Sequence, residues 1–157
     1  MAILRPFNTF GPRQSARAVI PTIISQAQSG QPIRLGALDP VRDLTFVKDT
    51  VVGFIRIAEK DECIGEVVNL GNGKGISIGD LATRICGLIG ETPSFHAQLP
   101  ERLRPPASEV QRLIADTSKA RRLLDWQPRF SLEEGLTETI GWMASHLPQY
   151  KPDLYTV

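Results

Sequence analysis

The chain has 157 residues, of which 41% are hydrophobic, 6% aromatic and 22% charged, values typical of a soluble globular protein. Its formal net charge of +1 creates no overall field that would attract nucleic acid or an anionic membrane. The two cysteines and two histidines are scattered, which excludes a recognisable zinc motif and predicts free thiols. With no leader pattern and no apolar run of about 18 residues, we expect a cytoplasmic protein.

The first half of the sequence predicts strands and helices in alternation. An apolar segment leads into a loop at Gly11-Pro12, and Ile20, Ile23 and Ala27 recur at helical spacing. A further helix should begin at Asp49 or Thr50, and its apolar stripe consists of Val51, Phe54, Ile55 and Ala58. The expected elements are a strand at 2–7, a helix at 18–29, a short strand at 33–35 and an extended segment at 42–47.

The second half begins with a predicted buried strand and ends with two predicted helices. Ser77 followed by Asp80 is typical of a helix start, and Gly90 of a helix end. Prolines make the segment 101–108 irregular. Besides the helix between Ser77 and Gly90, we expect strands at 67–70 and near 94–98, a helix at 118–124, and a last helix capped by Ser131 and Glu134 that carries Leu132, Leu136, Ile140, Met143 and Leu147 on one face.

Five residues with three glycines, Gly71 to Gly75, lie between a predicted strand and a predicted helix, as in a dinucleotide-binding turn. The G-x-G-x-x-G pattern fails because Ile76 stands where the third glycine is needed. A phosphate-binding loop of the Walker A type also fails, since no Ser or Thr follows Lys74. We therefore interpret the segment as a flexible turn into a capped helix, whose glycines supply positive φ angles.

No catalytic residue is evident from side-chain chemistry alone. His96 and His146 have no nucleophile at a motif spacing, and Glu133-Glu134 are explained as charges at a helix N-terminus. Arginines are more informative because the guanidinium group matches phosphate oxygens. Each one alone is ordinarily a surface charge, so only convergence on one cleft would indicate an anion site. The arginines at expected strand ends or loops are Arg5, Arg13, Arg17, Arg42, Arg104 and Arg112.

The ordered motifs of this chain resemble the second half of the extended short-chain dehydrogenase/reductases, in the NAD-dependent epimerase/dehydratase family. The stretches 13–17 and 108–112 look most like nucleotide-sugar 4,6-dehydratases of the UDP-N-acetylglucosamine type. The segments that carry the resemblance are Leu4-Arg-Pro-Phe-Asn-Thr-Phe-Gly-Pro-Arg13, Ile33-Arg-Leu-Gly36, Arg42-Asp-Leu-Thr-Phe-Val-Lys-Asp49, Val67-Val-Asn-Leu-Gly71, Ala115-Asp-Thr-Ser-Lys-Ala120, Leu124-Asp-Trp-Gln-Pro128 and Ser131-Leu-Glu-Glu-Gly-Leu136.

The resemblance implies a role for particular residues in binding a nucleotide-diphosphate sugar. Between Arg104 and Glu109 the chain is two residues longer than the family pattern, which leaves Arg112 as a substitute for Arg104. The implied roles are the diphosphate for Asn8, the nucleotide for the backbone of Ala18, Val19 and Ile20, the base for Leu35 and Gly36, the diphosphate or ribose for Arg42, a phosphate for Arg104 or Arg112, the ribose for Glu109, and the border of the nicotinamide for Pro6 and Phe7.

The resemblance also implies an α/β fold: the C-terminal substrate-binding part of an extended Rossmann-fold enzyme, with most of the parallel sheet missing. Residues 3–7 and 66–70 would be strands of that sheet, and residues 16–46 and 90–157 the smaller lobe. The cofactor fingerprint and the Tyr-x-x-x-Lys pair are absent, since neither Tyr150 nor Tyr155 has a Lys four residues later.

We therefore expect NAD or NADP to bind the intact parent and not this chain alone, which should be catalytically inactive. Expected partners are the missing N-terminal half and a second copy of the chain. A 4,6-dehydratase is the favoured parent. A 4-epimerase, or a non-enzymatic nucleotide-sugar-binding module, remains the alternative.

Overall fold

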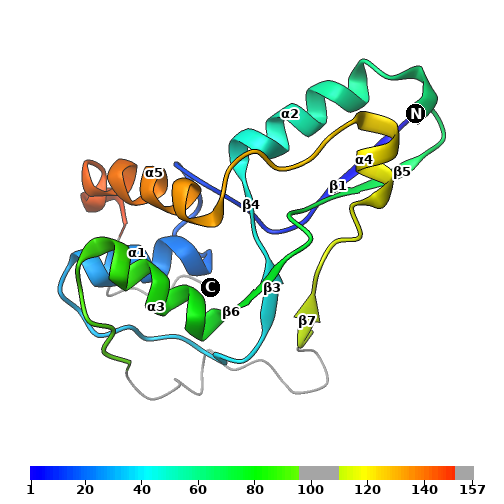
Figure 1. Cartoon of the computed structure of the whole chain (residues 1–157). Coiled ribbons are helices and arrows are strands. Elements are labelled where there is room, and N and C mark those ends of the chain that lie inside the picture. The colour runs from blue at the N-terminus through cyan, green and yellow to red at the C-terminus, as the bar shows by residue number, and fades with distance from the viewer. Residues whose placement is uncertain (96–109, 151–157) are drawn as a thin grey trace. The chain divides into compact units, whose positions relative to one another are not determined.

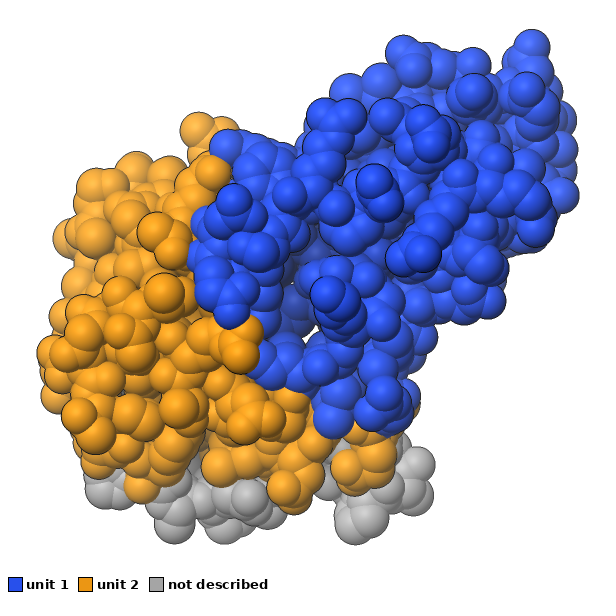
Figure 2. Space-filling model, viewed as in Figure 1, with its two compact units in different colours: residues 1–10, 41–76, 112–135 blue, residues 11–40, 77–111, 136–157 orange. Residues whose placement is uncertain are grey.

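The structure is a computed structural model that describes residues 1–95 and 110–150, an alternation of strands and helices (Figure 1). The chain divides into two compact units, coloured blue and orange in Figure 2. Unit 1 contains residues 1–10, 41–76 and 112–135, and unit 2 contains 11–40, 77–111 and 136–157. The predicted smaller lobe, 16–46 with 90–157, coincides with neither unit, because 41–46 and 112–135 belong to unit 1 with the first strand. The predicted irregular segment 101–108 lies outside the described residues.

Unit 1 is built on two parallel strands, β1 (Ile3–Pro6) and β5 (Val67–Leu70). Helix α2 (Val47–Ala58) contacts β1, and helix α4 (Ser118–Leu124) contacts β5 (Figure 1). Strands at both predicted places are therefore confirmed, while their membership of a larger sheet stays a prediction. The core between these elements consists of Cys63, Val68, Leu70, Ala120, Leu124 and Trp126, with Cys63 in a short 3-10 helix, Asp61–Cys63.

Short strands join the remaining segments of unit 1. β2 (Thr9–Phe10) pairs in parallel with β4 (Thr45–Phe46). β3 (Val41–Asp43) lies between β6 (Gly75–Ser77) and β7 (Arg112–Leu113), and its pairing with β7 is parallel. The extended segment predicted at 42–47 is thus confirmed as far as Phe46, where the chain turns into α2.

Helix α2 differs from its prediction at its start. It begins at Val47, not at Asp49 or Thr50, and the preceding Phe46 offers no side-chain cap. Asp49 is buried and holds a different segment instead, because its carboxylate accepts hydrogen bonds from the backbone amides of Arg129 (3.0 Å) and Phe130 (3.2 Å). A buried carboxylate needs such donors, and no local pattern in the sequence reveals them.

The face of α2 that packs on the strands is not the predicted apolar stripe. Its buried positions include Thr50 and Gly53, and a Cβ added to Gly53 would lie 2.7 Å from Leu70 Cδ1. The predicted apolar stripe points elsewhere: Val51 is 51% exposed, Phe54 49% and Ile55 52%. Unit 1 therefore has an apolar helix face that the described residues do not cover.

Unit 2 is held by α1 (Val19–Gln28) and α3 (Ile78–Ile89), which contact each other through buried isoleucines and leucines. The predicted helix start is confirmed, because Ser77 Oγ accepts a hydrogen bond from the Asp80 amide at 3.0 Å. The predicted stop is confirmed as well, since Gly90 has a φ of 89°. The strand expected at 33–35 is reduced to a single bridge between Ile33 and Phe95, and the remainder of the strand expected near 94–98 lies outside the described residues.

Helix α5 (Leu132–Ala144) begins with the predicted capping pair. The Glu134 amide donates to Ser131 Oγ at 3.2 Å, and the Ser131 amide donates to Glu134 Oε2 at 2.7 Å. These bonds to the Ser131 amide and hydroxyl lower the pKa of Glu134. A short 3-10 helix, Leu147–Gln149, follows, and the Tyr150 hydroxyl donates to the Gln14 carbonyl at 2.9 Å within unit 2.

Candidate functional site

The strand end that follows β1 positions Asn8. The Phe7 amide donates to the Leu70 carbonyl at 2.8 Å, and the Thr45 amide donates to the Asn8 carbonyl at 3.1 Å. The Asn8 side chain is exposed, and its Nδ2 donates to the Asp43 carbonyl at 3.1 Å. This bond uses one of the two hydrogens on Nδ2, and the second is the one that could be donated to a ligand oxygen. Ligands of open α/β sheets bind at this end of parallel strands.

Asp43 fixes the loops around this strand end. Its carboxylate is completely buried and accepts hydrogen bonds from the backbone amides of Asn72 (2.7 Å), Gly73 (2.8 Å) and Ala115 (3.1 Å). We call Asp43 with these amide donors the Asp43 hub. Charge-assisted bonds of this kind are the stronger ones, so the hub holds two loops from distant parts of the chain in fixed positions. Asp43 was not predicted as a site residue, because its only signal in the sequence is an acidic residue within an extended apolar segment.

The glycine segment 71–75 is a closely packed turn, and the prediction that its glycines supply positive φ angles holds for Gly73 alone. Only Gly73 has a positive φ, 73°, among its three glycines. Gly71 and Gly75 are required by close approach instead. A Cβ on Gly71 would lie 2.4 Å from Ala115 Cβ, and a Cβ on Gly75 would lie 2.5 Å from Val41 Cγ1. The segment is a turn packed against the Asp43 hub and followed by β6, which explains its glycines without a dinucleotide.

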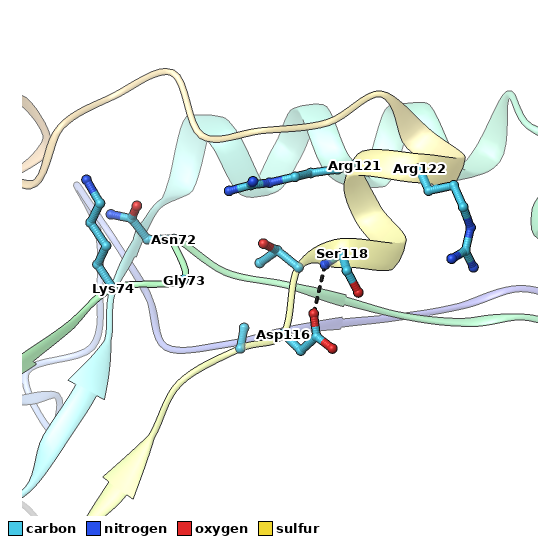
Figure 3. Close-up of a pocket in the computed structure, with 9 residues that line it drawn as sticks. Asn72, Gly73, Lys74, Asp116, Ser118, Arg121 and Arg122 are labelled. Atoms are coloured by element: carbon cyan, nitrogen blue, oxygen red, sulfur yellow. Dashed lines mark hydrogen bonds between the residues drawn. The ribbon is translucent and has the colours of Figure 1, made fainter.

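A hollow of about 690 Å3 opens beside this turn in unit 1 (Figure 3). In that view, Arg121 extends from α4 towards Asn72, whereas Arg122 points away from it. Asp116 Oδ1 accepts a hydrogen bond from the Ser118 amide at 2.9 Å, and this bond lowers the pKa of Asp116. None of the predicted ligand residues lies here. The lining residues are Asn72, Gly73, Lys74, Ala115, Asp116, Thr117, Ser118, Arg121 and Arg122.

Two predicted arginines of unit 1 lie on neighbouring strands. In the register of β3 and β7, Val41 is opposite Arg112 and Arg42 is opposite Leu113. Since side chains alternate between the faces of a sheet, Arg42 and Arg112 project to opposite faces. Arg42 is half-buried, and its Nη1 donates to the Val41 carbonyl at 3.0 Å. Asn8 thus bonds the backbone of the residue that follows Arg42, and Arg112 projects to the other face of the sheet from Arg42.

The ligand residues predicted in unit 2 would contact a ligand through backbone groups more than through side chains. Ile20 is 1% exposed and Leu35 6%, so both are core residues. The Ala18 amide donates to the Ser15 carbonyl at 3.0 Å. Helix geometry leaves the amides of Val19 and Ile20 without intrahelical partners, and such amides suit an anion. Gly36 is half-buried. Arg104 and Glu109 lie outside the described residues.

The backbone at Pro6 and Phe7 has little to offer a cofactor by hydrogen bonding. Pro6 has no amide hydrogen, and the Phe7 carbonyl accepts a bond from Thr9 Oγ1 at 3.2 Å. Within the described ranges, no group of three or more His, Cys, Asp and Glu side chains could hold a metal ion. Both cysteines are free and buried, and burial raises the pKa of each thiol. No helix in the described part of the chain is long and apolar enough to cross a membrane.

Comparison with known proteins finds dehydratases and epimerases, both by sequence and by structure. The family model described as GDP-mannose 4,6 dehydratase matches residues 1–139. The dTDP-glucose 4,6-dehydratase of Haemophilus influenzae is 31% identical over 143 residues, which are 86% of this chain and 42% of that protein. An epimerase from Methanothermobacter thermautotrophicus superposes with a TM-score of 0.83 at 34% identity, over 95% of this chain and 44% of that one.

A structure with bound ligands also matches. The UDP-glucuronic acid 4-epimerase of Bacillus cereus, in complex with UDP-glucuronic acid and NAD, gives a TM-score of 0.79 at 30% identity, over 92% of this chain and 45% of that one. The chain therefore spans less than half the length of these relatives.

Fold and matches together define the class: the C-terminal part of the Rossmann-like extended short-chain dehydrogenase/reductases, among NAD-dependent epimerases and dehydratases of nucleotide sugars. Within that class, the chain belongs to the GDP-mannose 4,6 dehydratase family. The resemblance inferred from the sequence motifs is confirmed at this level.

Proposed function

We propose that this chain is the sugar-nucleotide-binding half of an NAD(P)-dependent nucleotide-sugar 4,6-dehydratase, acting on a substrate of the UDP-N-acetylglucosamine type and inactive alone. One observation supports the proposal: in a chain that matches the dehydratase family over residues 1–139, the Asn8 side chain bonds the carbonyl of Asp43, the residue after Arg42, at the carboxyl end of the parallel strand β1.

In the intact enzyme the reaction oxidises the sugar at C4, eliminates water across C5 and C6, and returns hydride to give a 4-keto-6-deoxy sugar nucleotide. Bound NAD(P) supplies acceptance and return of the hydride. The residues of this chain bind and orient the substrate. In unit 1, Asn8 donates to the diphosphate and Arg42 neutralises its charge. In unit 2, the family resemblance assigns the backbone of Ala18, Val19 and Ile20 to the nucleotide. Leu35 and Gly36 border the base, and Arg104 (or Arg112) and Glu109 bind phosphate and ribose.

The same geometry assigns no proton transfer to this chain. A Tyr-x-x-x-Lys pair is absent from the sequence, and Pro6 and Phe7 have no free amide hydrogen for a cofactor. Pro6 and Phe7 therefore border the nicotinamide without holding it, and NAD(P) requires the other half of the protein.

A 4-epimerase is the second candidate, because two of the matching proteins described above are epimerases. An epimerase shares the oxidation at C4 and differs in returning hydride to the opposite face. A polypeptide that completes a dehydratase should carry an Asp-Glu pair beside the catalytic Thr. Product analysis of the completed enzyme separates the two, since only the dehydratase forms a 4-keto-6-deoxy sugar.

Calorimetric titration of the chain with UDP-N-acetylglucosamine tests the binding role. We expect weak binding that Arg42→Met reduces by roughly 10- to 150-fold, because a charge-assisted bond contributes roughly 1.5–3 kcal/mol. Arg129→Met is the matched control, since Arg129 is an exposed arginine elsewhere in unit 1. Tight binding by the chain alone would instead support a stand-alone binding module, and equal affinities of both variants would contradict the assignment of Arg42.

A further inference from the structure

The hollow in unit 1 lies between two loops that the Asp43 hub holds in place. One wall is the turn at Asn72 and Gly73, whose amides both donate to the Asp43 carboxylate. The other wall begins at Ala115, whose amide donates to the same carboxylate. The walls approach each other at Thr117, since a Cβ added to Gly73 would lie 3.8 Å from Thr117 Oγ1. With about 690 Å3, the hollow is a preformed space of the size that small molecules occupy.

Positive side chains dominate the lining of the hollow. Lys74, Arg121 and Arg122 contribute three positive charges and Asp116 one negative charge, which gives a net charge of +2 in a chain whose total is +1. Within residues 1–95 and 110–150, the side chains of Lys74 and Arg121 make no hydrogen bond or ion pair. Arg121 extends towards Asn72 on the facing wall, whereas Arg122 points away from it (Figure 3). Two cations without a protein partner therefore converge on one hollow, as an anion site requires.

The buried hydroxyl group of Thr117 also lacks a partner. Thr117 is only 8% exposed, and its side chain does not cap helix α4, which it precedes. In the described part of the chain, no residue makes a hydrogen bond with Thr117 Oγ1. Buried polar side chains normally have a partner, so an exception indicates something bound beside it. Because Thr117 lines the hollow, an occupant of the hollow is the partner within reach.

We infer that the hollow is an anion site that binds the phosphate group of a small phosphate monoester. Arg121 and Lys74 pair with the phosphate oxygens, and Thr117 Oγ1 donates to one of them. The charges match, because a monoester phosphate carries about −1.5 to −2 at pH 7 and the lining carries +2. The opposing carboxylate, Asp116, is already engaged by the Ser118 amide at 2.9 Å. None of the residues proposed for the sugar nucleotide lines the hollow, so the inference goes beyond the proposed function and does not depend on it.

NMR of the isotope-labelled chain at constant ionic strength tests the inference, with inorganic phosphate and glucose 6-phosphate as probes and glucose as the uncharged reference. We expect both phosphates, and not glucose, to shift the backbone amide signals of Lys74 and Thr117. The double substitution Lys74→Met and Arg121→Met should weaken binding at least about tenfold, because it removes two charge-assisted bonds. Lys60→Met with Arg129→Met is the matched control. It removes the same charge from exposed positions of unit 1 outside the hollow, so the affinity should stay within about twofold.

Thr117→Val isolates the contribution of the hydroxyl group, and we expect the affinity to fall by about threefold or more. Amide signals far from the hollow show whether each variant keeps its fold. The inference is overturned if neither phosphate shifts signals at the hollow, or if glucose 6-phosphate does not bind. It is also overturned if the control pair weakens binding as much as the Lys74 and Arg121 pair, or if Thr117→Val leaves the affinity unchanged. Failure of UDP-N-acetylglucosamine to shift Asn8 and Arg42 would contradict the proposed function and leave this inference intact.

Discussion

The Asp43 hub lies in the same unit as the outer stripe of α2, by which we mean the exposed apolar residues Val51, Phe54, Ile55 and Ala58. The two places differ in how far the described residues satisfy them. At the hub, a buried carboxylate accepts bonds from three backbone amides, so a costly group is fully compensated. At the outer stripe, three large apolar side chains stay about half exposed. The contrast indicates that the described residues of unit 1 satisfy the polar groups around Asp43 and leave one face of α2 uncovered. Substitutions at the two places should therefore have very different effects on the chain alone.

Asp43→Asn should have the largest effect. The amide nitrogen of the new side chain would face a backbone N–H, and the charge that strengthens the bonds would be lost. We expect the free energy of unfolding to fall by about 3–5 kcal/mol. Urea unfolding measures this. Asp116→Asn is the control, because Asp116 is exposed in the adjacent loop, and an equal loss in both variants would refute the role of the hub.

Shortening one apolar side chain in the unit 1 core and one on the exposed face of α2 compares the two sides of this helix. Leu124 is completely buried in the unit 1 core, so Leu124→Ala should cost about 2–5 kcal/mol. Phe54→Ser, in contrast, should change the stability of the chain alone by no more than about 0.5 kcal/mol. Thermal unfolding of both variants tests the difference. A large loss in Phe54→Ser would mean that the outer stripe is already covered within the chain.

The same substitution at two glycines should have opposite signs. Gly71→Ala would place a Cβ 2.4 Å from Ala115 Cβ and 2.7 Å from Asp43 Oδ2, so we expect a loss of about 1–3 kcal/mol. Gly87 lies on α3 with nothing within 4 Å of an added Cβ. Gly87→Ala should therefore stabilise the chain by about 0.5–1 kcal/mol. Equal effects in chemical unfolding would show that the turn is as loose as the sequence suggested.

The smallest expected effect concerns the partly exposed pair of Glu66 and Lys119. Lys119 Nζ donates to Glu66 Oε2 at 2.7 Å, and this bond, with the lysine charge, lowers the pKa of Glu66. Because the folded pKa is depressed, the pair stabilises the fold above the unfolded pKa of Glu66 and stops doing so as pH falls through the folded value. Lys119→Met should raise the pKa of Glu66 in an NMR titration, and Lys74→Met should leave it in place.

Local patterns made part of the fold predictable. Both capping pairs, Ser77 with Asp80 and Ser131 with Glu134, act across three residues and are visible in the sequence. The Asp43 hub joins residues 29, 30 and 72 positions apart, and no pattern in one sequence reveals such a contact. The outer stripe was visible as a helical period, but periodicity does not say which partner covers a face.

We propose that Asn8 and Arg42 bind the diphosphate of the sugar nucleotide. NMR of the isotope-labelled chain, titrated with UDP-N-acetylglucosamine, tests this proposal directly. Unit 1 offers two places for an anion: the strand end with Asn8 and Arg42, and the hollow with Lys74 and Arg121. Our account predicts shifts in the side-chain amide of Asn8 and the guanidinium of Arg42. Shifts confined to Asn72, Lys74 and Arg121 would contradict it.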